Sequence, residues 1–369
     1  MQSLGIDLGT TNSVVSVERR VLPISDRGHT TLPSVVGFLP NGTISVGDTA
    51  RRRRAIDSSN TIYSSKRIIG RRYDDGQTRN FIERYPFEIV ELPGGWPAFR
   101  TRAGEFSPTQ VAERILREVV QRADVDPQRC EVVLAVPANF SNAQRQATAD
   151  AAISAGLGCP HLIDEPSATA LAYLHSNHPC RRALVYDLGG GTFDCAVLDC
   201  SKGTPRMVSH ASDLQLGGDD IDYELARWVA RLVLEKHNWD LANYSETWDR
   251  LLAHCEDAKI ALSVDREASI FLSQVDPECP SGDEAVVLTQ TILEEICQSL
   301  VSRSFIACDD VLRMAGLRPP DIDAVFLAGG TSFLPVIQHG VQAYFGRSGF
   351  IEFDPTEVVA IGAGIASSC

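Results

Sequence analysis

Short apolar runs and amphipathic segments alternate along the first half of the chain. Apolar runs between turn residues predict strands, and apolar positions three and four apart predict helices. We therefore expect strands over 3–7, 13–18, 131–136 and 161–164, and helices over 49–70, 107–123, 141–155 and 167–175. The polar stretch 74–104 contains Pro93-Gly94-Gly95, which predicts loops with short strands.

The same pattern begins again at residue 183. Strands are expected over 183–187, 193–199, 208–213 and 324–327, helices over 217–262 and 289–315 and after 354, and a β-rich insert over 267–287. In each half a strand ends in an Asp-Leu-Gly turn, at Asp7 to Thr11 and at Asp187 to Thr192. This restart favours a duplicated α/β unit in which each copy carries a smaller inserted subdomain.

Both turns have the composition of a phosphate-binding loop. Glycines let backbone N–H groups approach phosphate oxygens, and the threonines that follow add hydroxyl donors. A carboxylate beside a phosphate requires a cation, and hydrated magnesium prefers oxygen ligands. No Gly-Lys-Ser/Thr follows either turn, which excludes a P-loop. One turn alone is most simply a hairpin, but two near-identical turns favour a shared site for a triphosphate with magnesium.

A third glycine turn, Ala328 to Ser332, follows an apolar strand and precedes an expected helix. The start of a helix can meet an anion or a nucleoside there. The alternative for this turn is a plain strand–helix connection.

The composition, 44% hydrophobic and 22% charged, is that of a soluble globular chain, and the net charge is -14. A strongly acidic chain is a poor candidate for binding duplex DNA or an anionic membrane, so we expect neither partner. The basic run Arg51 to Arg54 is the local exception. We interpret it as a solvated helix face, with a site for an anionic partner as the alternative.

None of the ten cysteines lies in a CxxC pair, which argues against zinc. Their scatter, without a visible targeting segment, indicates reduced thiols and a cytoplasmic protein. No apolar run approaches the roughly 20 residues of a membrane span.

Several motifs in this order resemble the seventy-kilodalton heat-shock (DnaK) family, specifically its N-terminal ATPase domain, over essentially the whole chain. The motifs that are similar to those of the family are Gly5 to Ser13, Lys66 to Arg72, Val136 to Phe140, Gln144 to Thr148, Asp164 to Ala170, Asp187 to Asp194, Leu216 to Asp220 and Gly329-Gly330. The segment Asp354 to Ala360 also resembles the divergent HscC-type branch.

The resemblance implies the duplicated ribonuclease-H-like fold of actin, hexokinase and heat-shock ATPases, with the nucleotide in a central cleft. Lobe I would cover 1–180 with an insert at about 36–106, and lobe II 181–369 with an insert at about 216–300.

The resemblance also implies a catalytic set. Lys66 would reach the γ-phosphate and the attacking water, where a cation stabilises developing charge. Glu165 and Asp194 would position that water or its proton chain. Thr192 would touch the γ-phosphate, and Asp7 would complete the set.

Asp7 and Asp187 would hold magnesium, and potassium is expected as well. Pro137 and Arg145 would couple the state of the nucleotide to the surface of the domain. The positions that would bind the nucleotide are Gly9, Thr10, Thr11, Asn12, Gly189, Gly190, Gly191, Gly218, Glu256, Lys259, Ser263, Gly329, Gly330, Thr331 and Phe333.

The adenosine site departs from the family pattern. The family usually holds adenine between two arginines, and Ile260 and Phe333 occupy those positions here. Phe333 can stack on a base, while Ile260 offers only apolar contact. Thr356 replaces a carboxylate that is usual near the end of the domain. These changes leave phosphate chemistry alone and bear on nucleotide affinity and base preference.

The sequence ends at Cys369, before the linker, peptide-binding domain and lid of the full-length family members. We therefore expect no peptide-binding domain in this chain, whether it is a natural stand-alone ATPase or a part of a longer protein. The resemblance implies a J-domain co-chaperone and a nucleotide exchange factor as partners, and we expect a monomer.

Three other functions fit the same scaffold. A nucleotide sensor would bind without turnover, and a small-molecule kinase would transfer phosphate to an acceptor such as a sugar. An actin-like filament protein would pellet with nucleotide.

Overall fold

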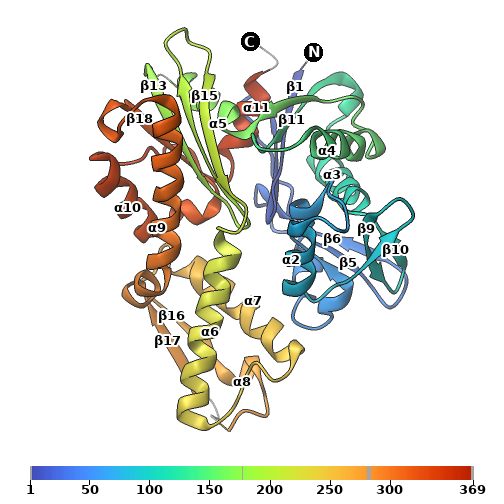
Figure 1. Ribbon diagram of the computed structural model, residues 1–369. Helices are drawn as coiled ribbons and strands as arrows, with labels where there is room; N and C mark the ends of the chain where they lie inside the picture. The colour runs from blue at the N-terminus through green and yellow to red at the C-terminus, as the bar shows by residue number, and fades with distance from the viewer. Residues whose placement is uncertain (1, 177, 281–283, 367–369) are drawn as a thin grey trace.

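The computed structural model describes residues 2–176, 178–280 and 284–366. Figure 1 shows two halves side by side, the first in blue to green and the second in yellow to red. The chain passes from one half to the other through α5 (Glu165–Leu174). It returns at its end, where α11 (Val358–Ala366) packs against α5 and against the strands of the first half.

The first half is built on a six-stranded sheet of order β12-β11-β1-β2-β3, with β4 also paired to β2. Its strands are β1 (Gln2–Leu8), β2 (Asn12–Val17), β3 (Arg20–Val21), β4 (Thr31–Pro33), β11 (Cys130–Val136) and β12 (His161–Asp164). Helix α3 (Pro108–Ala123) packs on β2 and on α4 (Asn142–Ser154), and α11 contacts β1, β2 and β11. Capping boxes at Ser107 and Ser141 fix where α3 and α4 begin.

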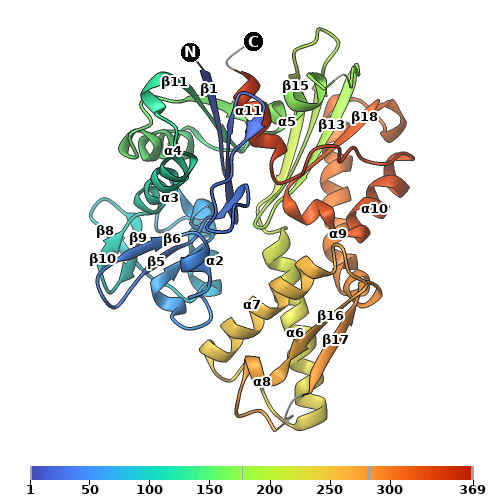
Figure 2. The same ribbon diagram turned by 180° about the vertical axis from the view of Figure 1, so that it is seen from behind.

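The second half repeats this arrangement with a sheet of order β15-β14-β13-β18. Its strands are β13 (Arg182–Leu188), β14 (Phe193–Asp199), β15 (Arg206–Asp213) and β18 (Ala324–Ala328). Helix α9 (Gln290–Ala315) packs on β14 and β15, and α10 (Pro335–Phe345) packs on α9 (Figure 2). Like β1, β13 pairs antiparallel with the next strand and parallel with a later one. The two Asp-Leu-Gly turns therefore follow equivalent strands.

Each half carries a smaller set of elements below its main sheet (Figure 1). In the first half these are β5 (Val36–Phe38), β6 (Ile44–Val46), α1 (Asp48–Arg51), β7 (Thr61–Ile62), α2 (Gly76–Arg84), β8 (Glu88–Leu92), β9 (Trp96–Thr101) and β10 (Gly104–Phe106). In the second half they are α6 (Gly218–His237), α7 (Ser245–Ala261), β16 (Glu267–Phe271), α8 (Leu272–Val275) and β17 (Ala285–Thr289).

Short 3-10 turns connect several of these elements. They are η1 (Ser58–Asn60), η2 (Ser65–Ile68), η3 (Pro127–Arg129), η4 (Pro319–Asp321) and η5 (Gly330–Phe333).

The predicted helix over 49–70 is wrong. Only α1 and two 3-10 turns are helical there, and Thr61-Ile62 joins a sheet with β5. Residues 58–60 are Ser-Ser-Asn, whose side chains compete for backbone hydrogen bonds, and β-branched residues follow them. The run of basic residues favoured a helix in the prediction. The turn-forming residues at 58–60, the β-branched residues after them and the pairing with β5 determine the structure instead.

Helix α2 was not predicted within 74–104. Asp75 caps it by accepting a hydrogen bond from the backbone N–H of Gln77. The helix has nine residues and is strongly polar, and only Thr78 and Phe81 are buried, so it offers too few apolar positions for a helical pattern to be recognised. The other predicted strands and helices are confirmed, with ends shifted by a few residues.

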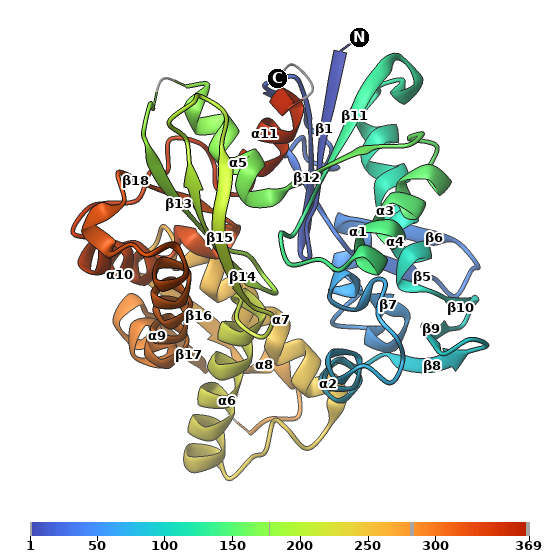
Figure 3. The ribbon, with the colours of Figure 1, turned by 45° about the horizontal axis from the view of Figure 1, so that its top comes forward.

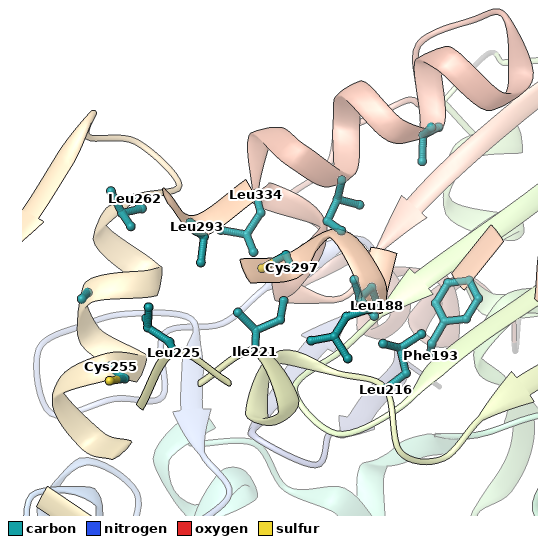
Figure 4. Close-up of a cluster of buried hydrophobic side chains, with 14 of the residues drawn as sticks. Leu188, Phe193, Leu216, Ile221, Leu225, Cys255, Leu262, Leu293, Cys297 and Leu334 are labelled. Carbon is teal, nitrogen blue, oxygen red and sulfur yellow. The ribbon is translucent and has the colours of Figure 1, made fainter. Parts of the chain in front are cut away.

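A large hydrophobic cluster lies directly behind the second Asp-Leu-Gly turn. Figure 4 shows Leu188 of that turn close to Ile221 of α6 and Cys297 of α9. Because these side chains are almost fully buried, the turn rests on a close-packed support.

All nine cysteines in the described residues carry free thiols, as predicted, and Cys369 lies outside them. Among the helices that the structure describes, none combines the length and apolar character needed to cross a membrane.

Candidate functional site

A cleft of about 1540 Å³ lies between the two halves. Both Asp-Leu-Gly turns, the third glycine turn and α7 contribute to its wall. The predicted residues that line it are Asp7, Gly9, Thr10, Thr11, Asn12, Lys66, Glu165, Asp187, Gly189, Gly190, Gly191, Thr192, Glu256, Lys259, Ile260, Ser263, Gly329, Gly330, Thr331, Phe333 and Thr356. The fold thus brings together residues that lie up to 349 positions apart, from Asp7 to Thr356.

Four predicted residues lie outside this wall: Gly218, Asp194, Pro137 and Arg145. Gly218 supports the second turn, since its backbone N–H donates to the Gly189 carbonyl at 3.0 Å. The Thr331 hydroxyl donates to the same carbonyl at 2.9 Å. Asp194 lies directly opposite Asp187 in the β13–β14 hairpin.

Ser34 holds the first turn in place. Its backbone N–H donates to the Thr11 carbonyl at 2.8 Å, and its hydroxyl donates to the Gly9 carbonyl at 2.8 Å. These two hydrogen bonds fix the backbone of the turn at Gly9 and Thr11, both of which line the cleft.

The two turns touch across the cleft, and this contact depends on glycine. A Cβ at Gly190 would lie 1.8 Å from the Thr11 hydroxyl oxygen, and one at Gly191 would lie 2.7 Å from the Thr10 methyl carbon. In the described structure the Thr11 hydroxyl is buried without a hydrogen-bond partner. Buried hydroxyls are normally hydrogen-bonded, and this one could donate to a phosphate oxygen of a bound ligand.

Acidic side chains crowd the floor of the cleft. Burial raises the pKa of Asp7 to about 7, with Lys66 opposing and Glu165 reinforcing the shift. Burial and the neighbouring Glu165 raise the pKa of Asp194 to about 6. Burial, followed by Glu165 and Asp194, holds the pKa of Asp187 well above its ordinary value. So many adjacent carboxylates favour a cation at this site.

Lys66 is the cation that the chain itself supplies there. Its Nζ donates to Glu165 Oε1 at 2.8 Å, and both side chains are 10% exposed. Burial lowers the pKa of Lys66, but Glu165 and Asp7 more than offset this and leave the pKa raised. Lys66 is therefore charged and held at the floor of the cleft. Ser64 just before it has a φ of 54°, a strained conformation that is common at functional sites.

The donor set fits a hydrated magnesium ion rather than a metal enclosed by protein ligands. In the described parts of the chain, no three His, Cys, Asp or Glu side chains are placed to ligate one metal directly. Magnesium commonly keeps several waters and binds one or two carboxylates together with substrate phosphates. Asp7 and Asp187, which line the cleft beside the phosphate turns, match that mode.

Arg145 connects the segment after β11 to the residue before Glu165. Its guanidinium donates to the Phe140 and Ala138 carbonyls at 3.2 and 3.3 Å and to Asp164 at 2.5 Å. Asp164 directly precedes Glu165, so Arg145 ties the position of Glu165 to the loop that begins at Pro137.

The nucleoside end of the cleft combines apolar and charged groups. Ile260, Val264 and Phe333 line it together, and Ile260 is 50% exposed and Val264 87%. Lys259 is buried, with its Nζ 2.8 Å from Asp222. The apolar groups suit a base, and the buried charges suit ribose hydroxyls.

The solvated helix face proposed for Arg51 to Arg54 holds only for Arg52, which is exposed. For Arg51, Arg53 and Arg54 it is wrong, because they pair with acidic residues. Arg54 donates to Glu256 at 2.6 Å and lies over the Tyr63 ring at 3.9 Å. Burial would raise the pKa of Glu256, but Arg54, Arg51 and Lys259 lower it to about 2. Arg51 donates to Asp257 at 3.0 Å. These pairs join the segment around α1, in the first half of the chain, to α7, in the second half (Figure 3).

The residues that join the two halves beside the two Asp-Leu-Gly turns (the phosphate turns) were not identified from the sequence. Asp219 accepts hydrogen bonds from Ser64, Arg67 and Tyr85 at 3.1, 3.3 and 3.0 Å. Asp219 belongs to the motif Leu216 to Asp220, which was the one feature of the sequence that could have indicated a role for it. Its partners lie more than 130 positions away, so no local pattern pairs them.

Comparison with known proteins identifies relatives of this chain. A family model described as Hsp70 protein matches residues 3–369. A protein named chaperone protein HscA homolog, from Polynucleobacter asymbioticus, is 39% identical over 374 residues. The match covers 98% of this chain and 57% of that protein, so the chain spans little more than half of its relative's length.

Proposed function

The chain belongs to the Hsp70 family, and from that premise we propose that it binds and hydrolyses ATP as the ATPase module of a heat-shock-type molecular chaperone. Members of the Hsp70 family have the actin-like ATPase fold and bind ATP and ADP. The observation that carries the proposal is the contact of two phosphate-type turns over a floor holding Lys66 and Glu165.

In the proposed reaction, the backbone N–H groups and threonine hydroxyls of the two turns hold the phosphates. Magnesium, held through Asp7 and Asp187, would neutralise phosphate charge. Lys66 stabilises charge on the γ-phosphate, and Glu165 accepts a proton from the attacking water. Thr192 and Asp194 position the water and the γ-phosphate. The products are ADP, inorganic phosphate and a proton.

A single-turnover assay with radiolabelled ATP tests hydrolysis against nucleotide sensing. The proposal expects phosphate to appear in solution, at a rate well above that of the Lys66→Ala variant. Binding with no phosphate release would favour the sensor. Transfer to a sugar would favour a kinase, and nucleotide-dependent pelleting would favour a filament protein.

The proposed base contact predicts the effect of removing Phe333. Phe333→Ala is expected to weaken ATP binding by about 5- to 150-fold, because a base–aromatic stack contributes roughly 1–3 kcal/mol. The cleavage step should change much less, because Phe333 lies at the nucleoside end. Titration calorimetry with ATP and GTP measures the loss, and Phe271→Ala, an exposed aromatic outside the cleft, is the control. An unchanged dissociation constant would show that Phe333 does not stack on the base.

The raised pKa values of Asp7 and Asp194 predict a pH dependence. The free protein gains stability from these protonated carboxyls below the unfolded pKa, and loses it as pH rises through about 6 to 7. Magnesium and Lys66 favour the ionised forms, so binding of the magnesium–nucleotide complex should release protons and tighten by about tenfold from about pH 5.5 to 7.5.

Calorimetry of this binding at about pH 6.5, in buffers of different ionisation enthalpy, counts the released protons. ATP and Asp7 also titrate in this range, so the difference between the wild type and Asp194→Asn isolates the protons released by Asp194. Equal proton release in the two proteins would contradict the assignment to Asp194.

We also infer that 1–180 and 181–369 act as two lobes, with inserts at about 36–106 and 216–300, that close on the nucleotide. By resemblance to the family, Pro137 and Arg145 would transmit that closure to a J-domain co-chaperone. A nucleotide exchange factor would reopen the cleft. Potassium would bind beside the nucleotide together with magnesium. The contact of Arg145 with Asp164, next to Glu165, supports the relay. The resemblance to the HscC-type branch of the family and the cytoplasmic location remain predictions.

A further inference from the structure

A second cavity, of about 590 Å³, lies beside the phosphate turns. It shares Thr10, Lys66 and Thr192 with the nucleotide cleft. These three residues surround the position proposed for the γ-phosphate. The two cavities therefore meet where the phosphoanhydride bond would be cleaved.

The wall of this second cavity is basic in an acidic chain. Its charged residues are Lys66, Arg67, Arg71 and Arg84, and no aspartate or glutamate is among the described residues that line it. Its other polar residues are Thr10, Thr192 and the amides Gln77, Asn80, Gln144 and Gln215. Each of these cations has an acidic partner behind the lining: Lys66 has Glu165, Arg67 has Asp219, Arg71 has Asp75 and Arg84 has Asp220. A guanidinium carries five N–H donors, so donors remain beside these pairs. Together with the neutral amides they suit an oxyanion better than a metal ion or an apolar ligand.

These cations become more exposed along the cavity. The side chains of Lys66 and Arg67 are 10% exposed, that of Arg71 17% and that of Arg84 27%. Asn80 on α2 is exposed at the outer end. The basic wall thus runs from the phosphate turns to the surface beside α2.

Arg67 at the inner end keeps a donor without a protein partner. Its other guanidinium nitrogens donate to the Leu214 carbonyl at 3.1 Å and to Asp219 at 3.3 Å. Its Nε is buried and has no hydrogen-bond partner in the part of the chain that the structure describes. A Cβ at Gly191 would lie 2.9 Å from this Nε, so the donor lies over the second phosphate turn. Leaving a buried donor unpaired is costly, and an anion arriving from that turn would satisfy it.

The nucleoside end of the cleft is open, since Ile260 there is 50% exposed and Val264 87%. Bound ADP would lie between that opening and the place where the γ-phosphate is cleaved. The second cavity meets the cleft at that place, so a phosphate that leaves through it does not have to pass the diphosphate.

We propose that the second cavity is a transit site for inorganic phosphate, through which the cleaved γ-phosphate leaves while ADP stays bound. This inference rests on the proposed hydrolysis of ATP. Arg67 receives the oxyanion at the phosphate turns, and Arg71 and Arg84 guide it past α2. No bond forms or breaks in the transit itself.

Two variants obstruct this route by different means. Asn80→Trp places a bulky ring at the exposed outer end, and Arg71→Glu places a negative charge along the wall. The matched controls are Arg79→Trp, on α2 but outside the cavity lining, and Arg72→Glu, whose native guanidinium lies 4.7 Å over the Trp96 ring, also outside the lining.

The test measures phosphate exchange on the ADP-bound protein with magnesium, using radiolabelled inorganic phosphate. Entry and exit should both slow by about tenfold in Asn80→Trp, a rise in barrier that leaves the phosphate affinity little changed. In Arg71→Glu entry should slow by at least about tenfold, because the new carboxylate also repels the phosphate. The controls should exchange at the wild-type rate. Exchange within about twofold of wild type in Asn80→Trp would overturn the transit site.

Single-turnover cleavage of ATP, followed by acid quench, is measured on the same proteins. Cleavage within about twofold of wild type shows that the variants are folded and chemically intact. A wild-type protein that fails to cleave ATP would refute the proposed function. The exchange of phosphate with the ADP complex would still decide the transit site separately.

Discussion

The Lys66→Ala variant is expected to cleave bound ATP about 10²- to 10³-fold more slowly than the wild type, by analogy with the loss of one charge-stabilising donor. Lys66 is the cation that contacts Glu165 and faces Asp7 on the floor of the cleft. The alanine variant leaves those carboxylates without it. The phosphates would still be held by the two turns, so nucleotide binding should survive.

Single-turnover cleavage and titration calorimetry, run on the same preparations, separate the two effects. Arg72→Ala is the matched control, because it removes a cation from the same segment but outside the cleft. Cleavage at the wild-type rate in Lys66→Ala would remove Lys66 from the chemical step. Loss of all nucleotide binding would instead assign it to holding the substrate.

The Gly362→Ala variant is expected to be destabilised by about 1–3 kcal/mol, the usual cost of overpacking. Gly362 lies where α11 crosses α5. A Cβ there would lie 1.7 Å from the Ala168 carbonyl oxygen and 2.3 Å from its carbon. Both atoms belong to the backbone of α5, so no side-chain rotation relieves the clash, and the helices must separate.

Urea denaturation measures this loss as a lower midpoint. Gly76→Ala is the control, because a Cβ there meets nothing within 4 Å and the residue begins α2. Because α5 and α11 connect the two halves, Gly362→Ala should also weaken nucleotide binding. An unchanged midpoint would mean that the helices do not cross this closely.

Much of the fold and of the candidate site could be predicted from local patterns. Strand β1 is an apolar run that ends in Asp-Leu-Gly, and β13 repeats it, so the two turns and the repeat were visible in the sequence. The predicted starts of the helices at 107 and 141 agree with α3 and α4, which begin at capping boxes. The region between 49 and 104 was predicted poorly, since it consists of short elements that are stabilised by contacts with distant segments.

The sequence by itself determined the family, the two turns and the acidic and basic residues at the floor of the cleft, because these are recorded in short contiguous motifs. Only the tertiary structure decided which charges meet. Arg54 pairs with Glu256, 202 positions away, and Arg67 pairs with Asp219, 152 positions away. The basic wall beside the phosphate turns likewise exists only once α2 and the turns come together. The physical reason is that periodicity and capping act within a few residues, whereas burial and ion pairing depend on how distant segments pack.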